Sequence, residues 1–226
     1  RTMSLLATSN KEKQNKVKIL FYGQSIVAGL NSENIINKLR KQYPNAIIEY
    51  ENRAIGGFTA PSLVRTAVHD LYPYYPDLLI FHVYDGVENG ELERIIYNTR
   101  KYTTSEILIF NHHYAWVQDS TGLRNRTYKD DIESDFLRQL AQKYGCELVD
   151  VRKEWKEYID KHPSIKINNL MGDEIKSDVH PNKKGHKLLE LLLLRHLKFN
   201  PIAYDKYNRG WFNEVRTYDM RRFNEE

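Results

Sequence analysis

The sequence predicts an α/β protein, a three-layer α/β/α sandwich built on a parallel sheet of about five strands. Two observations lead to this fold class. Short, near-continuous apolar runs recur along the chain, and segments with the apolar spacing of a helix separate them. Such alternation is typical of a doubly wound sheet with helices on both faces. A chain of 226 residues is long enough for one such domain, and a second full domain would be cramped.

The predicted strands are five apolar runs rich in β-branched residues. Near-continuous hydrophobicity indicates strands that are covered on both faces, and hence a parallel sheet. The runs are VKILFY (17–22), AIIEYE (46–51), LLIFHV (78–83), EILIF (106–110) and CELVDV (146–151).

The predicted helices lie between these strands. They cover residues 32–42, a segment starting near 62, and residues 90–102, 130–144, 152–160 and 182–198. In the helix 130–144, spacing places Ile132, Phe136, Leu137 and Leu140 on the buried face, and Gly145 is a natural C-cap.

Domain boundaries are predicted at both ends of the strand–helix pattern. We expect an N-terminal tail at 1–16, one domain at 17–201, and at 202–226 a tail or the start of a further domain. The chain starts with Arg, and residues 1–16 hold no long apolar stretch. We therefore expect a trimmed or mature start, with any export signal outside this sequence.

Composition argues against several classes of partner. The net charge of +4 is mild and no long Lys/Arg block occurs, so we expect a solvated basic face and no nucleic-acid partner. The run LLELLLLRHL is too short to span a bilayer and is broken by Glu190 and Arg195, so we expect no membrane association. The single Cys146 cannot form an internal disulfide, and we expect a buried thiol.

Motifs for cofactors are missing from the sequence. Neither the phosphate-binding Gly-x-x-x-x-Gly-Lys-[Ser/Thr] pattern nor Gly-x-Gly-x-x-Gly occurs. The pairs His112–His113 and His180–His186 do not have the spacing of helical zinc ligands. We therefore expect no metal and no other cofactor.

Ligands bind at the carboxyl ends of the strands in an open α/β sheet, so the loops after the strands are the candidate sites. After the first strand, GQSIVAG places Ser25 beside a helix N-terminus, where backbone N–H groups stabilise negative charge. Ser25 is either a turn residue or a nucleophile. It is not the Gly-x-Ser-x-Gly elbow of α/β-hydrolases, because Val27 occupies the last Gly position.

Two further loops follow the second and third strands. NRAIGGFTAP contains Gly56 and Gly57, which let the backbone pass close to a ligand or simply form a flexible turn. HVYDGVENG offers Asp85, Glu88 and Asn89, either as site residues or as a cap for the following helix.

The fourth loop, SDVHPNKKGH, precedes the last predicted helix. His180 is followed by Pro181, which favours an extended conformation at the His. Asp178 lies two residues before it. A His with a nearby carboxylate has the composition of a general base with its orienting group.

Taken in order, the four loops resemble the sequence blocks of the SGNH (GDSL-type) hydrolase family, from about Lys16 to Pro201. GQS…G resembles the Gly-Asp-Ser block, NRAIGGFTA the second block and DVHPNKKGH the last. The four blocks together are specific for this family, whereas any single block is not. The resemblance implies a flavodoxin-like sandwich and a serine hydrolase. Ser25 would attack an ester carbonyl, His180 would take its proton, and the N–H groups of Ser25 and Gly57 would hold the oxyanion, at about 2.7–4 kcal/mol per donor.

Three positions depart from the family pattern. Gln24 replaces the usual Asp of the first block. Gly86 stands where the family carries an oxyanion Asn, with Asp85 and Asn89 nearby. Ser177 occupies the usual acid position. A one-residue deletion in the loop would make Asp178 the triad acid; otherwise a backbone carbonyl, or Asp173, orients His180.

Within the family, the chain is most similar to bacterial carbohydrate esterases that remove acetyl groups. Sixteen Tyr and three Trp supply surfaces on which sugars stack, and Tyr114 and Trp116 form either such a platform or a packed loop. The candidate substrate-binding residues are Gln24, Asp85, Asn111, His112, His113 and Trp116. The expected partner is a small-molecule or glycan ester, and the expected location is secreted or periplasmic. A non-catalytic carbohydrate-binding module, a thioesterase and a lysophospholipase stay open.

Overall fold

The fold is a five-stranded sheet with the strand order β2-β1-β3-β4-β7, and every neighbouring pair is parallel. The computed structural model describes residues 1–119, 122–125, 127–166, 169–172 and 179–201. The strands are β1 (Lys16–Gly23), β2 (Ile47–Asn52), β3 (Leu78–His82), β4 (Glu106–Phe110) and β7 (Glu147–Val149). The predicted α/β sandwich with about five parallel strands is confirmed.

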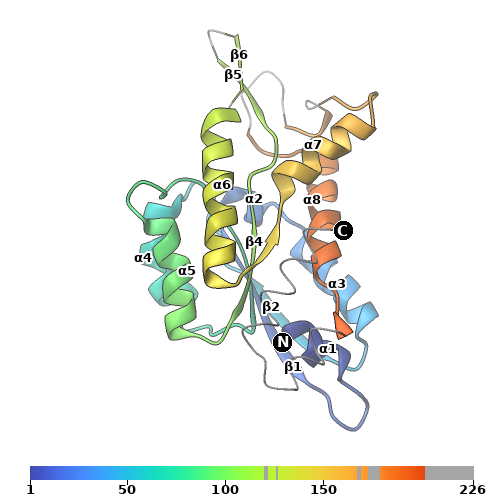
Figure 1. Ribbon diagram of the computed structural model, residues 1–226. Coiled ribbons are helices and arrows are strands. Elements are labelled where there is room, and N and C mark those ends of the chain that lie inside the picture. Colours follow the sequence, from blue (N-terminus) through green and yellow to red (C-terminus); the bar gives the residue numbers. More distant parts are fainter. Residues whose placement is uncertain (120–121, 126, 167–168, 173–178, 202–226) are drawn as a thin grey trace.

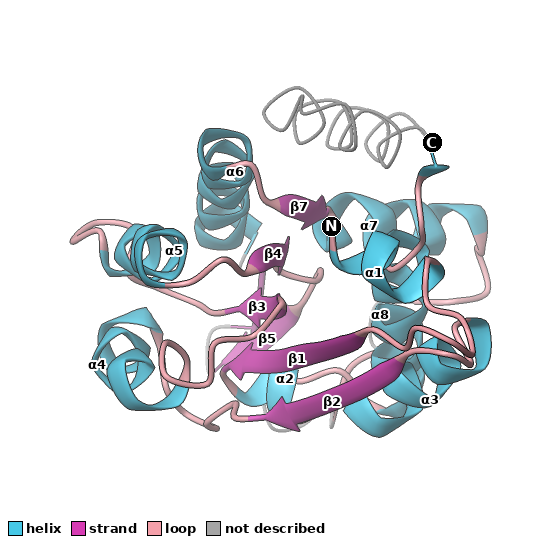
Figure 2. Ribbon diagram, turned by 90° about the horizontal axis from the view of Figure 1, so that it is seen from below, coloured by secondary structure: helices cyan, strands magenta, loops and turns pink. Residues whose placement is uncertain are grey.

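Helices cover both faces of the sheet (Figure 2). One face carries α4 (Ala60–Asp70), α5 (Glu91–Tyr102) and α6 (Thr127–Tyr144). The other carries α1 (Thr2–Ala7), α3 (Ser32–Gln42), α7 (Val151–Lys161) and α8 (Lys183–His196). Figure 1 shows the same layers from the side, with β5 (Trp116–Asp119) and β6 (Gly122–Asn125) forming a hairpin at one end.

Strand β1 explains why the sheet is buried on both sides. Its side chains alternate between the faces: Ile19 and Phe21 pack in one hydrophobic cluster, Leu20 and Tyr22 in the other. All four side chains are completely buried. A strand with no exposed face needs apolar residues at every position, which is the pattern seen in the sequence.

Strand β2 departs from that prediction because it lies at the edge of the sheet. Ile47 is 44% exposed, and only Ile48 is buried. The strand therefore carries alternating charged residues, as edge strands commonly do.

Helix α6 also buries a different face from the predicted one. Ile132 is 47% exposed, whereas Glu133 is buried together with Leu137 and Leu140. These three residues have the i, i+4, i+7 spacing of one helical stripe. A buried carboxylate thus takes the place that hydrophobicity alone assigned to Ile132.

The ends of the chain add to the predicted organisation. The expected N-terminal tail contains α1, which packs Leu6 into the core, and the N-terminal amino group lies 2.6 Å from Glu106. Residues 202–226 lie outside the described part of the chain. In the part that is described, no helix combines the length and apolar character needed to cross a bilayer. Cys146 is a buried free thiol, as predicted.

Candidate active site

Ser25 is the first residue of the short helix α2 (Ser25–Ala28), directly after β1. A side chain at Gly23 would place its Cβ 2.0 Å from the carbonyl oxygen of His82, so only glycine permits this approach of β1 to β3. Gln24 caps the helix, because its Oε1 accepts a hydrogen bond of 3.1 Å from the backbone N–H of Ile26. The N–H of Ser25, at the first helical position, has no intrahelical acceptor.

His180 meets Ser25 at this end of the sheet. Its Nε2 lies 2.7 Å from Ser25 Oγ, although the two residues are 155 apart in sequence. The predicted proximity of the first and last loops is confirmed. The distance allows direct proton transfer from the hydroxyl to the imidazole.

The backbone around His180 is held on two sides. The N–H of Gly172 donates to the carbonyl of His180 at 2.8 Å, and Met171 forms a β-bridge with Pro181. On the other side, His113 Nε2 lies 2.8 Å from the carbonyl oxygen of Val179. These contacts fix the imidazole's position through the main chain.

Ser25 Oγ has a second polar neighbour. Its hydroxyl donates to Gln24 Oε1 at 2.6 Å, in addition to its contact with His180. A hydroxyl has one proton, so it donates to one of these two groups at a time. While Gln24 accepts, His180 must donate to Ser25; for nucleophilic attack the proton must pass to His180.

The glycine loop is tied to the same turn. The N–H of Ile55 donates to the carbonyl of Gly23 at 2.9 Å, which brings the loop to the start of α2. Gly57 has φ +78°, in the left-handed region, and, its chain neighbours apart, no heavy atom of the described residues lies within 4 Å of where its Cβ would be. The open space next to this backbone leaves room for a ligand, and the φ angle favours glycine.

Two buried side chains that were not among the predicted site residues, His82 and Glu133, are linked to Gln24 beside Ser25. His82 Nδ1 is 3.2 Å from Gln24 Nε2, and its Nε2 is 3.0 Å from His112 Nδ1. His112 Nε2 is in turn 2.7 Å from Glu133 Oε2. A polar residue inside the apolar run LLIFHV, and a Glu on the Leu137–Leu140 stripe of α6, were the available signals.

The predicted substrate-binding residues occupy different environments. Asn111 is fully buried, and its amide bonds Asp150 Oδ1 at 2.8 Å and the N–H of Arg152 at 2.9 Å, so it anchors the start of α7. His112 and His113 are buried as well. The structure therefore places these three side chains beneath the surface and gives each a protein partner.

The remaining predicted residues are nearer the surface or outside the described part. Asp85 has φ +65° and pairs with Lys129. Trp116 begins β5, and its side chain lies outside the described residues, as do Asp173, Ser177 and Asp178.

Burial decides the charge of His113. Its removal from water is the main cause that lowers its pKa to about 3, while the hydrogen bond to the Val179 carbonyl acts in the opposite direction. The ring is therefore neutral at pH 7 and donates to that carbonyl. Among the described residues, no group of three His, Cys, Asp or Glu side chains could hold a metal ion.

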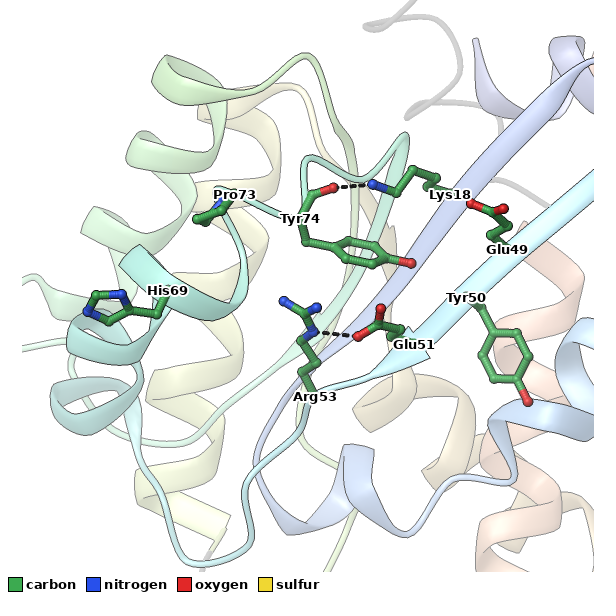
Figure 3. A pocket seen from close by; sticks show the side chains of 8 residues that line it. All are labelled: Lys18, Glu49, Tyr50, Glu51, Arg53, His69, Pro73 and Tyr74. Carbon is green, nitrogen blue, oxygen red and sulfur yellow. Dashed lines mark hydrogen bonds and ion pairs between the residues drawn. The ribbon is translucent and has the colours of Figure 1, made fainter.

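A hollow of about 550 Å³ lies elsewhere, beside the edge strand β2 (Figure 3). Tyr74 lies between Lys18 and Arg53, whose cationic groups are 4.2 and 4.7 Å from its ring centre. The lining residues are Lys18, Glu49, Tyr50, Glu51, Arg53, His69, Pro73 and Tyr74. None of them belongs to the predicted site, so this hollow is separate from the Ser25–His180 pair.

Comparisons with known proteins agree with this architecture. The sequence matches no protein-family model and no curated protein. Among solved structures, the chain is similar to the acetylxylan esterase Axe2 from Geobacillus stearothermophilus, at 20% identity and a TM-score of 0.66, over 83% of this chain and 96% of that one.

A second similar structure is a putative GDSL-like lipase from Parabacteroides merdae, at 16% identity and a TM-score of 0.63, over 82% of this chain and 98% of that one. At such identities the likeness shows a shared fold. The resemblance to SGNH hydrolases drawn from the sequence is thus confirmed at the level of the fold.

Proposed function

We propose that this protein is a serine esterase that removes acetyl groups from a carbohydrate. The observation that carries the proposal is the 2.7 Å contact between Ser25 Oγ and His180 Nε2 at the carboxyl end of β1. A hydroxyl within reach of an imidazole, next to free helix N–H groups, is the arrangement needed for acyl transfer.

In the proposed reaction, Ser25 Oγ attacks the ester carbonyl carbon while His180 Nε2 takes its proton. The carbonyl oxygen becomes an oxyanion held by the N–H groups of Ser25 and Gly57. The intermediate collapses to an acyl-enzyme, and His180 gives its proton to the departing alcohol. A water molecule, deprotonated by His180, then attacks the acyl group and releases the acid and free Ser25.

The group that orients His180 belongs to the proposal as well. Asp178 is our candidate acid, two residues before the base. An extended segment turns alternate side chains to the same side, which would let the carboxylate approach the imidazole. A backbone carbonyl or Asp173 would serve in its place.

The carbohydrate substrate is supported by the structural neighbours. Axe2 is described as an acetylxylan esterase, and one of its mutant structures as an acetyl-xylooligosaccharide esterase. Trp116 would supply a stacking surface, with Asp85 as a polar contact. The proposal includes a secreted or periplasmic location for this esterase.

The decisive experiment measures turnover of p-nitrophenyl acetate and acetate release from acetylated xylo-oligosaccharide, for the wild type and for Ser25→Ala. We expect at least a 10³-fold loss in kcat in the variant with both substrates. Ser4→Ala on α1, at a distance from His180, is the matched control and should retain wild-type turnover.

The other functions give distinct results in this experiment. A binding module shows no Ser25-dependent turnover and keeps glycan affinity in Ser25→Ala. A thioesterase or lysophospholipase hydrolyses its own acyl substrate through Ser25 and leaves the oligosaccharide untouched. Serine-directed phosphonate should label Ser25 alone; an active enzyme with unlabelled Ser25 contradicts the assignment.

A further inference from the structure

A continuous buried chain of hydrogen bonds starts at the residue beside the proposed nucleophile. It runs from Gln24 on the turn before α2, through His82 at the end of β3 and His112 after β4, to Glu133 on α6. The three contacts are 3.2, 3.0 and 2.7 Å long. Every member is at most 4% exposed. The chain is therefore shielded from bulk solvent along its length.

The direction of each donor follows from the two ends of the chain. Ile26 N–H donates to Gln24 Oε1, so the amide nitrogen Nε2 must face His82 and donate to its Nδ1. The proton of His82 is then on Nε2, which donates to His112 Nδ1. The proton of His112 is on Nε2 and faces Glu133, where a carboxylate can only accept.

A single arrangement of protons thus satisfies every buried group, with both imidazoles neutral. Burial is the main cause that holds the pKa of His82 well below its usual range, and the neighbouring His112 and His113 act in the same direction. His82 also stacks on Phe110, with ring centres 4.7 Å apart and planes at 9°. Both its charge state and its orientation are fixed.

This arrangement of protons fixes the orientation of the Gln24 amide. In the observed orientation its oxygen accepts from both Ser25 Oγ and Ile26 N–H. Turned by 180°, the amide would present N–H groups to the N–H of Ile26, leaving a buried donor unpaired at a cost of about 1–3 kcal/mol. Ser25 would then lose the acceptor that holds its hydroxyl.

We propose that His82, His112 and Glu133 are positioning residues that lock the amide of Gln24, so that its oxygen caps α2 at the N–H of Ile26 and keeps Ser25 Oγ within reach of His180. The inference rests on the proposed esterase function. It assigns no proton transfer to the buried chain; the chain acts on the geometry of the nucleophile only.

The test compares two substitutions at His82, one that keeps a hydrogen-bond acceptor for Gln24 Nε2 and one that removes it. His82→Asn places an amide oxygen close to the position of Nδ1 and keeps an acceptor for Gln24. His82→Phe keeps a ring against Phe110 and removes the acceptor. We expect His82→Phe to lower kcat on p-nitrophenyl acetate by about 10–100-fold with KM within about twofold, and His82→Asn to recover most of the loss.

Stability measurements separate positioning from folding. Phe preserves the stacking on Phe110, so the Tm of His82→Phe should be equal to or higher than that of His82→Asn. This order is the opposite of the order expected for kcat. His196→Gln, a substitution of a buried histidine at the C-terminal end of α8, controls for general destabilisation. Equal kcat in wild type and His82→Phe, or equal losses in His82→Phe and His82→Asn, would overturn the inference.

Two readouts separate this inference from the proposed function. A wild type without Ser25-dependent turnover contradicts the esterase proposal, and with it any role of the chain in catalysis. Independently, ¹⁵N NMR should show His82 and His112 neutral at pH 7 and both protonated on Nε2. Another tautomer at either ring would overturn the donor directions, whatever the activity.

Discussion

Buried histidines at the two ends of the sheet carry opposite charge states. At the carboxyl end, burial lowers the pKa of His82 and of His113. At the amino end, His196 has its pKa raised to about 9, because its hydrogen bonds to Glu147 and Glu154 outweigh the effect of burial. The two carboxylates lie 2.6 and 3.7 Å from the ring of His196, whereas His113 Nε2 lies 2.8 Å from a carbonyl oxygen.

The difference shows that burial alone does not decide the charge of such a ring, because two carboxylate partners reverse its effect at His196. A neutral histidine has one donor and one acceptor, so its neighbours can be oriented by it. A protonated histidine between two carboxylates instead forms an ion-pair cluster that contributes to stability. The neutral histidines at the carboxyl end of the sheet therefore suit the orientation of neighbouring groups, and His196 at the amino end links β7, α7 and α8 through its ion pairs.

The largest predicted effect concerns His180, which contacts the nucleophile. His180→Ala should lower kcat by more than about 10³-fold because the hydroxyl loses its base. His196→Gln should change kcat by less than about twofold. Steady-state kinetics of both variants on p-nitrophenyl acetate checks this, and similar losses would break the distinction between the two ends.

The next prediction tests which group orients His180: a carboxylate, as at His196, or a carbonyl oxygen. We predict that Asp178→Asn lowers kcat by about 10–100-fold, because an acid two residues before the base meets it at a poor angle. A loss of about 10⁴-fold would instead identify an ordinary triad. An unchanged kcat would point to a backbone carbonyl or to Asp173.

The substitution with the smallest expected effect on kcat, His196→Gln, should have a clear effect on the free energy of unfolding. Below pH 6.5 His196 is protonated in the folded and unfolded chain, so its ion pairs contribute fully. As pH rises towards about 9, the unfolded chain loses this proton first, and the contribution declines until it is gone.

Burial raises the pKa of Glu147, which offsets part of the gain, and we expect a net contribution of about 1–3 kcal/mol. Urea unfolding of the wild type and His196→Gln at pH 6 and pH 9.5 checks this. The variant should be less stable at pH 6 and closer to the wild type at pH 9.5. A constant difference would contradict the ion-pair account.

The fold could be predicted because central parallel strands are covered on both faces and need mostly apolar residues, which β1 and β3 have apart from Lys16, Lys18 and His82. In the edge strand β2, the adjacent Ile47 and Ile48 predict a strand buried on both faces, yet only Ile48 packs inward. Sequence order alone does not tell which strand ends the sheet.

The Ser25–His180 pair could be predicted from loop order, since both loops follow the sheet to the same edge. The buried partners could not. Glu133 was passed over because hydrophobic spacing weighs apolar residues only, and Ile132 next to it favoured the wrong face. His82 was read as part of an apolar strand, because a single polar side chain reveals its role only when its neighbours on β4 and α6 are known.

The contact between Ser25 and His180 also bears on how the protein is made. It joins the first strand of the sheet to the segment before the last helix, across 155 residues. Contacts this distant in sequence form late in folding. During synthesis from the N-terminus, the serine leaves the ribosome long before its proposed base exists. Under the proposed mechanism, the nascent chain gains esterase activity only once α8 has docked, and a product that ends before His180 has none.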